Sequence, residues 1–194
     1  DRILYARLDG FGLTDRGQGM ARLVADFFAD SAVTAVVSSP LLRTRQTAEP
    51  IASAHGLTTQ TDERLIEGTN VFEGSQVTAK RLLGTPSLWP HLRNPLRPSW
   101  GEPYRQIATR MRDAMDSAWH SVESGEVVLV SHQLPIWLVH LSAAKKPFAH
   151  LPSSRRCALA SVTSFARDEA EWREVSYDQP AAALLTGAMD LGAV

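Results

Sequence analysis

Three segments of the sequence carry side chains that suit phosphate ester chemistry. SSPLLRTRQTA contains Arg43, DERLIEG contains Glu67, and VSHQLP contains His132. An arginine offers positive charge and a planar fork of donors to a phosphoryl group. A histidine can hydrogen-bond a phosphoryl oxygen, and a carboxylic acid can protonate a leaving oxygen. These residue types together indicate a site for phosphate esters.

Strands and helices that alternate along the chain would bring these residues to one place. Short apolar or β-branched runs predict strands at 33–38, 58–62 and 127–130. Helical spacing or capping residues predict helices over 14–29, 39–55 (with Ser39 as N-cap and Pro40 at the first position), 104–122 and 135–144. CALASVTSFAR and EWREVSY predict two late strands that form a hairpin turned at 168–169. The pattern indicates an α/β sheet with crossovers.

The positions of the three residues relative to these strands matter. In an α/β sheet, ligands bind beyond the carboxyl ends of the strands. If the strands are parallel, Arg43, Glu67 and His132 meet in one pocket. Taken singly, each residue also fits a structural role: His132 as a buried hydrogen-bonding group, Arg43 as a surface residue of a helix, and Glu67 as a solvated loop carboxylate.

The length of the chain, 194 residues, suits one core rather than two. We therefore predict a single domain over 1–178, with an insertion or lid at about 74–104 and an apolar tail at 179–194. Within the insertion, Arg93, Arg97 and Trp100 could recognise the substrate, or could simply be solvated and packed in a small satellite core. The tail could dock on the protein itself or on a second subunit, so a monomer and a homodimer both stay open.

Composition and motifs exclude several classes of function. The net charge of −1 gives no field that favours nucleic acid or membrane, and no apolar run approaches the ~20 residues of a membrane span. The single cysteine, Cys157, excludes a disulfide framework and fits a reducing, cytoplasmic compartment. The sequence contains no HExxH motif, no Gly-x-Ser-x-Gly elbow and no P-loop. We expect a small phosphorylated substrate and neither a metal nor a cofactor.

Five segments, in the same order and across most of the chain, resemble signature motifs of the histidine phosphatase superfamily. They are LTDRG (13–17), SSPLLRTRQTA (38–48), LIEG (65–68), GE (101–102) and VSH (130–132). The last departs from the usual motif because Gln133 stands where a glycine usually follows. The resemblance implies a three-layer α/β/α fold of the phosphoglycerate-mutase type with a mostly parallel central sheet.

The resemblance also implies roles for individual residues. Arg43 would bind the phosphoryl group, His132 would stabilise it, and Glu67 would be the proton donor. Tyr5 and Arg7 lie in the loop that borders the pocket in this family. The implied activity is hydrolysis of phosphomonoesters through a phosphohistidine, without a metal.

The defining motif of that family, Arg-His-Gly at the end of the first strand, does not occur in this sequence. Its histidine is the nucleophile, and the expected place for it is just upstream of Asp1. Two explanations compete: the sequence starts late, which we favour, or the protein has lost its nucleophile and is a pseudophosphatase that holds a phosphorylated ligand. A phosphoglycerate-mutase-like phosphotransferase is a further alternative. In either case we expect a chain that starts at Asp1 to have negligible turnover.

Overall fold

A parallel sheet forms the middle layer of the fold, with strand order β2-β1-β3 in the part of the chain that the structure describes. The structure is a computed structural model, and it describes residues 6–8, 10–70 and 101–185. The strands are β1 (Val33–Ser38), β2 (Thr59–Thr61) and β3 (Glu126–Val130). β1 lies in the centre, where Val37 pairs with Gln60 of β2 and with Leu129 of β3, both in parallel.

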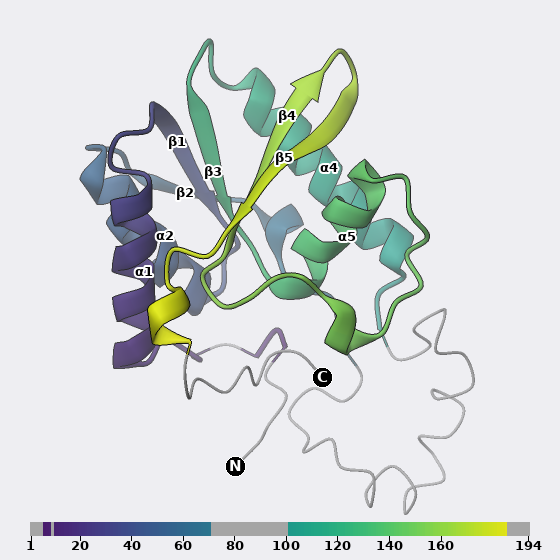
Figure 1. Cartoon of the computed structure of the whole chain (residues 1–194), viewed down its shortest axis with the longest axis horizontal. Coiled ribbons are helices and arrows are strands. Elements are labelled where there is room, and N and C mark those ends of the chain that lie inside the picture. Colours follow the sequence, from purple (N-terminus) through teal and green to yellow (C-terminus); the bar gives the residue numbers. More distant parts are fainter. Residues whose placement is uncertain (1–5, 9, 71–100, 186–194) are drawn as a thin grey trace, which may run out of the picture.

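Helices cover both faces of this sheet (Figure 1). α1 (Asp15–Phe27) and α2 (Leu42–Ala54) lie on one side of it, and α4 (Tyr104–His120) and α5 (Gln133–Ala143) lie on the other. Short 3-10 helices add the turns η1 (Glu63–Leu65), η3 (Pro152–Ser154) and η4 (Ala182–Leu184). The predicted three-layer α/β/α fold with a parallel central sheet is therefore confirmed.

The alternation of side chains along β1 explains the two cores. Val36 points into a cluster with Ala48 and Ile51 of α2, and these three side chains are almost fully buried. The next residue, Val37, packs instead against the cluster on the opposite face, which contains Leu65 and residues of α4 and α5. Successive strand residues face opposite sides, so one short strand anchors both layers of helices. Each fully buried aliphatic side chain contributes roughly 1.5–3 kcal/mol.

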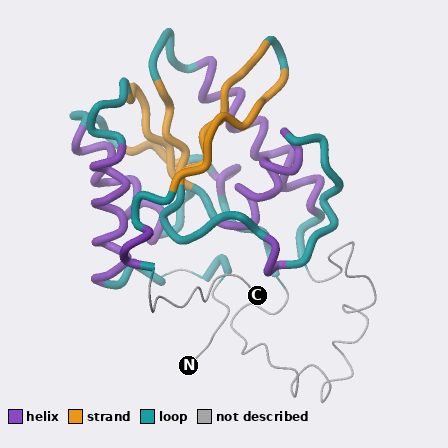
Figure 2. The backbone as a smooth tube through the Cα atoms, viewed as in Figure 1, coloured by secondary structure: helices purple, strands orange, loops and turns teal. Residues whose placement is uncertain are grey.

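An antiparallel hairpin follows the parallel sheet but is not part of it (Figure 2). It consists of β4 (Val162–Asp168) and β5 (Glu171–Asp178), as the sequence predicts. Trp172 attaches the hairpin to the body of the protein, because its ring is buried in the core of α4 and α5 and its Nε1 donates to Asp116. Among the described residues, β3 is paired on one side only, with β1.

The predicted starts of two helices have different outcomes. Thr14 caps α1 as expected, because its hydroxyl accepts from the backbone N–H of Gly17 at 3.2 Å. The start predicted at Ser39-Pro40 is wrong, since α2 begins at Leu42. Ser39 instead continues the line of the sheet, and its N–H donates to the carbonyl of Val130 at 2.9 Å.

Two predicted segments lie mostly beyond what the structure describes. Of the insertion at 74–104, only the last four residues are described, and of the tail at 179–194 only 179–185. In that part of the tail, Ala181 is buried and η4 contacts α1. Within the described ranges, no helix is both long and apolar enough to cross a membrane.

Candidate active site

Arg43 and His132 meet at the carboxyl ends of two neighbouring parallel strands. Arg43 lies in the first turn of α2, just after β1, and His132 lies between β3 and α5. Arg43 Nη2 is 3.2 Å from His132 Nδ1 and donates to the carbonyl of Ala6 at 2.7 Å. On the other side of the ring, His132 Nε2 is 2.8 Å from the hydroxyl of Ser39. Because a guanidinium can only donate, Nδ1 is the acceptor, and the ring proton is on Nε2 and points to Ser39.

The surroundings of His132 keep its ring neutral. Its side chain is buried, and burial is the main cause that lowers its pKa from 6.5 to about 3. The positive charges of Arg43, Arg110 and Arg7 lower the pKa further. A cationic environment around a neutral ring suits an anionic ligand, because a phosphoryl group would offset these charges.

Glu67 lies on the loop that follows β2 and η1. Its environment raises the pKa of its carboxyl, whereas that of His132 lowers the pKa of the ring. Its Oε1 accepts from the N–H of Gly68 at 2.8 Å. Burial raises the pKa of its carboxyl, while the Gly68 bond and the charges of Arg155, Arg43 and Arg110 lower it by less. The carboxyl therefore keeps its proton to a higher pH than an exposed glutamate would, as a proton donor requires.

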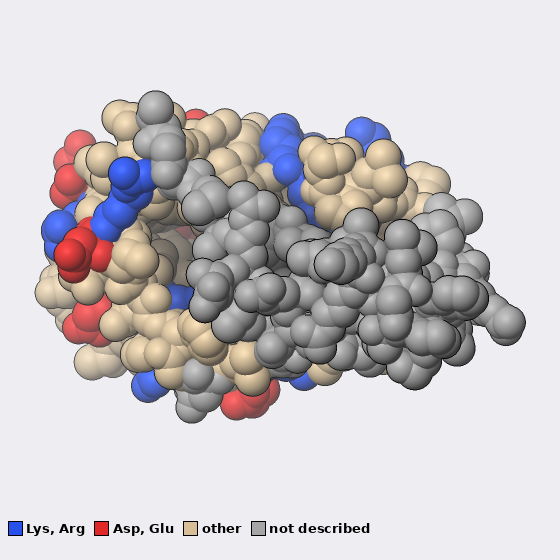
Figure 3. All heavy atoms as spheres, turned by 90° about the horizontal axis from the view of Figure 1, so that it is seen from below, with Lys and Arg blue, Asp and Glu red and all other residues tan. Residues whose placement is uncertain are grey.

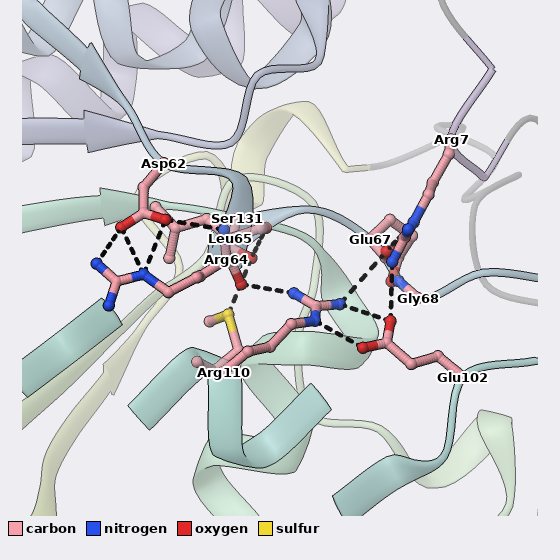
Figure 4. A network of polar contacts seen from close by, with 10 residues as sticks. Arg7, Asp62, Arg64, Leu65, Glu67, Gly68, Glu102, Arg110 and Ser131 are labelled. Carbon is pink, nitrogen blue, oxygen red and sulfur yellow. Dashed lines mark hydrogen bonds and ion pairs between the residues drawn. The ribbon is translucent and has the colours of Figure 1, made fainter. Parts of the chain in front are cut away.

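Glu102 organises two arginines beside this loop (Figure 4). It accepts two hydrogen bonds from Arg110, one from Nε to Oε1 at 2.9 Å and one from Nη2 to Oε2 at 3.1 Å. Arg7 Nη2 donates to the same Oε2 at 2.8 Å. The Glu102 and Arg110 side chains are both mostly buried, so this pair is stronger than an exposed one.

The same arginines hold the backbone that carries Glu67. Arg7 Nε donates to the carbonyl of Glu67 at 2.6 Å, and Arg110 Nη1 donates to the carbonyl of Arg64 at 2.5 Å. Ser131, the residue before His132, donates its hydroxyl to the carbonyl of Leu65 at 2.7 Å. The loop of Glu67 is thus tied to α4, to the first loop and to the end of β3 (Figure 4).

Close backbone contact explains the glycine that precedes Glu102. Gly101 forms an isolated bridge with Asn70, and a Cβ atom at Gly101 would lie 2.1 Å from the carbonyl oxygen of Thr69. Such a contact is impossible, so a side chain here would push the start of α4 away from the loop of Glu67. The backbone geometry that places Glu102 therefore requires a glycine at 101.

The structure brings together the three residues that the sequence singles out. Arg43 and His132 are in direct contact, and Glu67 is close enough for the charge of Arg43 to lower its pKa. Arg7 is also at the site, where it binds the backbone of Glu67. The other predicted substrate-binding residues lie outside the described residues: Tyr5, Arg93, Arg97 and Trp100.

Two further residues of the site were not predicted. The sequence predicts a helix cap at Ser39, but its hydroxyl binds His132. Arg110 gave no signal of its own, because nothing in the sequence links it to Glu102 eight positions earlier. In the described ranges, no group of three or more His, Cys, Asp or Glu side chains could hold a metal ion.

The lower face of the molecule, seen in Figure 3, shows a hollow with basic side chains inside and beside it. This face is the underside of the molecule in Figure 1, where the lower ends of the strands lie.

Comparison with known proteins assigns the chain to a family. The model of the histidine phosphatase superfamily (branch 1) matches residues 1–180, and the chain belongs to this superfamily. The uncharacterized protein Rv0525 of Mycobacterium tuberculosis is 49% identical over 181 residues, which are 93% of this chain and 90% of that protein. A probable phosphoglycerate mutase, GpmB, of Yersinia pestis is 30% identical over 165 residues, 82% of this chain and 75% of that protein.

Solved structures share the fold at lower identity. The mycobacterial glucosyl-3-phosphoglycerate phosphatase Rv2419c, in complex with inorganic phosphate, has a TM-score of 0.75 at 24% identity and 93% coverage of both chains. YhfR of Bacillus stearothermophilus has a TM-score of 0.74 at 23% identity, with 89% of this chain and 87% of that chain covered. Phosphoserine phosphatase of Entamoeba histolytica, with 3-phosphoglyceric acid, has a TM-score of 0.72 at 17% identity, with 98% and 90% covered.

Proposed function

We propose that this protein is a phosphomonoester hydrolase that needs no metal and works through a phosphohistidine intermediate. The observation that carries the proposal is the contact of Arg43 with a buried, neutral His132 at the ends of adjacent parallel strands. The carboxyl of Glu67, with its raised pKa, supports it. Relatives named as phosphatases and mutases, with phosphate, phosphoserine or 3-phosphoglyceric acid in some of the solved structures, are consistent with a small phosphorylated substrate.

Binding would use the positive charge of the site. Arg43 has a planar fork of donors that fits two oxygens of a phosphoryl group. The phosphoryl dianion would offset the guanidinium charges that lower the pKa of His132, and the pKa would therefore rise. The ring could then carry a proton on Nδ1 as well and donate it to a third oxygen. The two residues therefore orient the phosphorus atom and stabilise the charge of the transition state.

Two displacements at phosphorus complete the reaction. In the first, a histidine nitrogen forms a bond to phosphorus while the ester P–O bond breaks, and the leaving oxygen takes the proton of Glu67. In the second, a water molecule attacks the phosphorus and gives its proton to the Glu67 carboxylate. The P–N bond breaks, inorganic phosphate leaves, and both the histidine and the protonated Glu67 are regenerated.

The nucleophile is part of the proposal. We place it in an Arg-His-Gly segment before Asp1, at the end of a strand that would lie between β3 and β4. Two observations support this placement. The described part of the chain pairs β3 on one side only, and the apolar residues Val127 to Val130 are only half-buried. A further strand would satisfy that edge and cover those side chains.

Trapping of the intermediate tests the function. The protein, expressed with the segment that its gene encodes before Asp1, is mixed with a labelled phosphomonoester and quenched in alkali. We expect phosphate bound to the protein that is stable to base and lost in acid, as for phosphohistidine. The chain from Asp1 should give none, and His132→Asn should give much less. A protein that hydrolyses the ester without any such species would contradict the mechanism.

The alternatives predict other results in the same experiment. Tight binding of phosphate without labelling or turnover would indicate a pseudophosphatase, and transfer of label to a second ester would indicate a mutase. A reducing compartment such as the cytoplasm is part of our proposal, because a chain with one cysteine, Cys157, cannot form a disulfide within itself. The oligomeric state, either monomer or homodimer, stays a prediction.

A further inference from the structure

Arg155 carries a positive charge beside the proposed site without a carboxylate partner among the described residues. Its Nε donates to His150 Nε2 at 3.0 Å, and its Nη1 donates to the side-chain oxygen of Gln133 at 3.4 Å. No ion pair within the described ranges includes Arg155. Two neutral acceptors therefore hold the guanidinium in place without neutralising it.

Both acceptors are fixed by contacts of their own. His150 Nδ1 is 2.7 Å from the carbonyl of Phe148 and must donate to it, which leaves Nε2 to accept from Arg155. The His150 ring is stacked on Tyr104, with 5.2 Å between the ring centroids. The amide nitrogen of Gln133 donates to the carbonyl of Cys157 at 3.1 Å, so its oxygen is turned toward Arg155. The guanidinium is thus held in one orientation before any ligand arrives.

The position of Arg155 connects it with the phosphoryl site. Gln133 directly follows His132 and begins α5. The charge of Arg155 acts on Glu67, and among the charges that lower the pKa of Glu67 it comes before those of Arg43 and Arg110. Gln133 thus holds Arg155 next to the start of α5 and His132, and the effect of its charge on Glu67 is consistent with a place on the side of the proposed proton donor, where the leaving group of a phosphate ester would lie.

We propose that Arg155, positioned by Gln133 and His150, binds a second anionic group on the leaving-group side of the substrate. This inference rests on the proposed function. An arginine has five N–H donors, and the bonds to His150 and Gln133 use two of them, which leaves three for a ligand. A carboxylate or a second phosphate group offers the acceptors that this fork needs. The substrate class is therefore a phosphomonoester with a second negative charge near the ester oxygen.

Three compounds separate the sources of that charge in a kinetic test. Phosphoglycolate carries a carboxylate, ethylene glycol bisphosphate carries a second phosphate, and ethyl phosphate carries neither. The protein, with the segment encoded before Asp1, is compared with Arg155→Gln and Gln133→Ala. Arg156→Gln is the matched control, because the adjacent Arg156 binds Glu174 and lies over the ring of Tyr177 on the hairpin.

We expect the wild-type protein to prefer at least one of the two doubly anionic esters. Arg155→Gln should lower kcat/KM for the preferred doubly anionic ester roughly 10–100-fold, mainly by raising KM. The loss of kcat/KM for ethyl phosphate should be at least ~10-fold smaller. Gln133→Ala should shift the preference in the same direction by a smaller amount. Arg156→Gln should keep the wild-type ratio between the esters.

Two results would overturn the inference. One is a wild-type protein without preference for a second anion. The other is an equal loss for all three esters in Arg155→Gln, because that pattern means that Arg155 acts on Glu67 alone. If none of the esters is hydrolysed, the proposed function fails. In that case, calorimetric titration measures the affinity of each variant for the same three compounds. A loss of affinity in Arg155→Gln that is confined to the doubly anionic compounds supports the role of Arg155, and an equal loss for all three overturns it.

Discussion

Glu102 and Arg110 form an ion pair with two hydrogen bonds, at 2.9 and 3.1 Å, and Arg110 also donates to the carbonyl of Arg64 in the stretch that leads to Glu67. Arg7 shares the same carboxylate and binds the carbonyl of Glu67. One mostly buried carboxylate thus pairs with two guanidinium groups beside the proposed proton donor. Because the charge of Arg110 lowers the pKa of Glu67, we expect the charge of its partner Glu102 to influence the protonation of Glu67 indirectly.

Glu102→Gln should shift the pH dependence of catalysis. The amide keeps the shape of the side chain but leaves Arg110 and Arg7 without their counter-charge. The positive charges that face Glu67, from Arg43, Arg110 and Arg155, would then favour its ionised form more strongly. We expect the pKa of Glu67 to fall by roughly half a unit to one unit, which moves the basic limb of the kcat/KM profile to lower pH.

Asp62→Asn is the matched control for this shift. Asp62 also pairs with an arginine, Arg64, at 2.6 Å, and it lies in the same stretch of chain. Its partner Arg64 is not among the groups that act on Glu67, whereas Arg110, the partner of Glu102, is. The basic limb should stay where it is in this variant. An equal displacement in both variants would mean that the Glu102 result reflects a general loosening of the loop.

Glu67→Gln should affect esters according to their leaving groups. An alkyl oxygen leaves poorly without a proton, so hydrolysis of an alkyl phosphate should fall by about 10²–10⁴-fold. A p-nitrophenolate leaves without protonation, and its ester should lose much less in the phosphorylation step. Initial rates on the two esters, measured with the same protein preparations, check this. Equal losses on both would remove Glu67 from the role of proton donor.

The buried His132 should make the free energy of unfolding depend on pH. Its pKa is lowered from 6.5 to about 3 in the folded protein, so the unfolded chain binds a proton between these values and the folded protein does not. The free energy of unfolding should therefore fall as the pH falls from 6.5 toward 3, with up to ~5 kcal/mol from this residue alone. Denaturant titrations across this range should show a shallower pH dependence for His132→Asn. Identical slopes would mean that His132 is not buried in its neutral form.

The sequence predicts the strands and helices that position the site, because these elements depend on local signals. Thr14 has the side chain of a helix cap, and Arg43 and His132 follow the apolar residues of β1 and β3 within a few positions. Parallel strands place their carboxyl ends at one edge. These features need no knowledge of the tertiary contacts, and the structure confirms the fold that they indicate.

Contacts between residues distant in sequence could not be predicted in this way. Ser39 has the residue type of a helix cap, yet pairing with β3 extends its backbone and turns its hydroxyl toward His132. The pairs Glu102–Arg7 and Gln133–Arg155 depend on how helices and loops pack, which spacing along the chain does not encode. Each of these side chains alone is an ordinary polar residue, and only the assembled fold gives it a partner.

The central claim is that Arg43 and His132 hold the phosphoryl group of a substrate in a site that needs no metal. The most direct test is the steady-state hydrolysis of p-nitrophenyl phosphate in EDTA, by the protein with the segment encoded before Asp1. We predict turnover by the wild-type protein and a loss of about 10³-fold or more in kcat/KM for both Arg43→Ala and His132→Ala, with circular dichroism spectra unchanged. Wild-type rates in either folded variant, or activity that EDTA abolishes, would contradict the account.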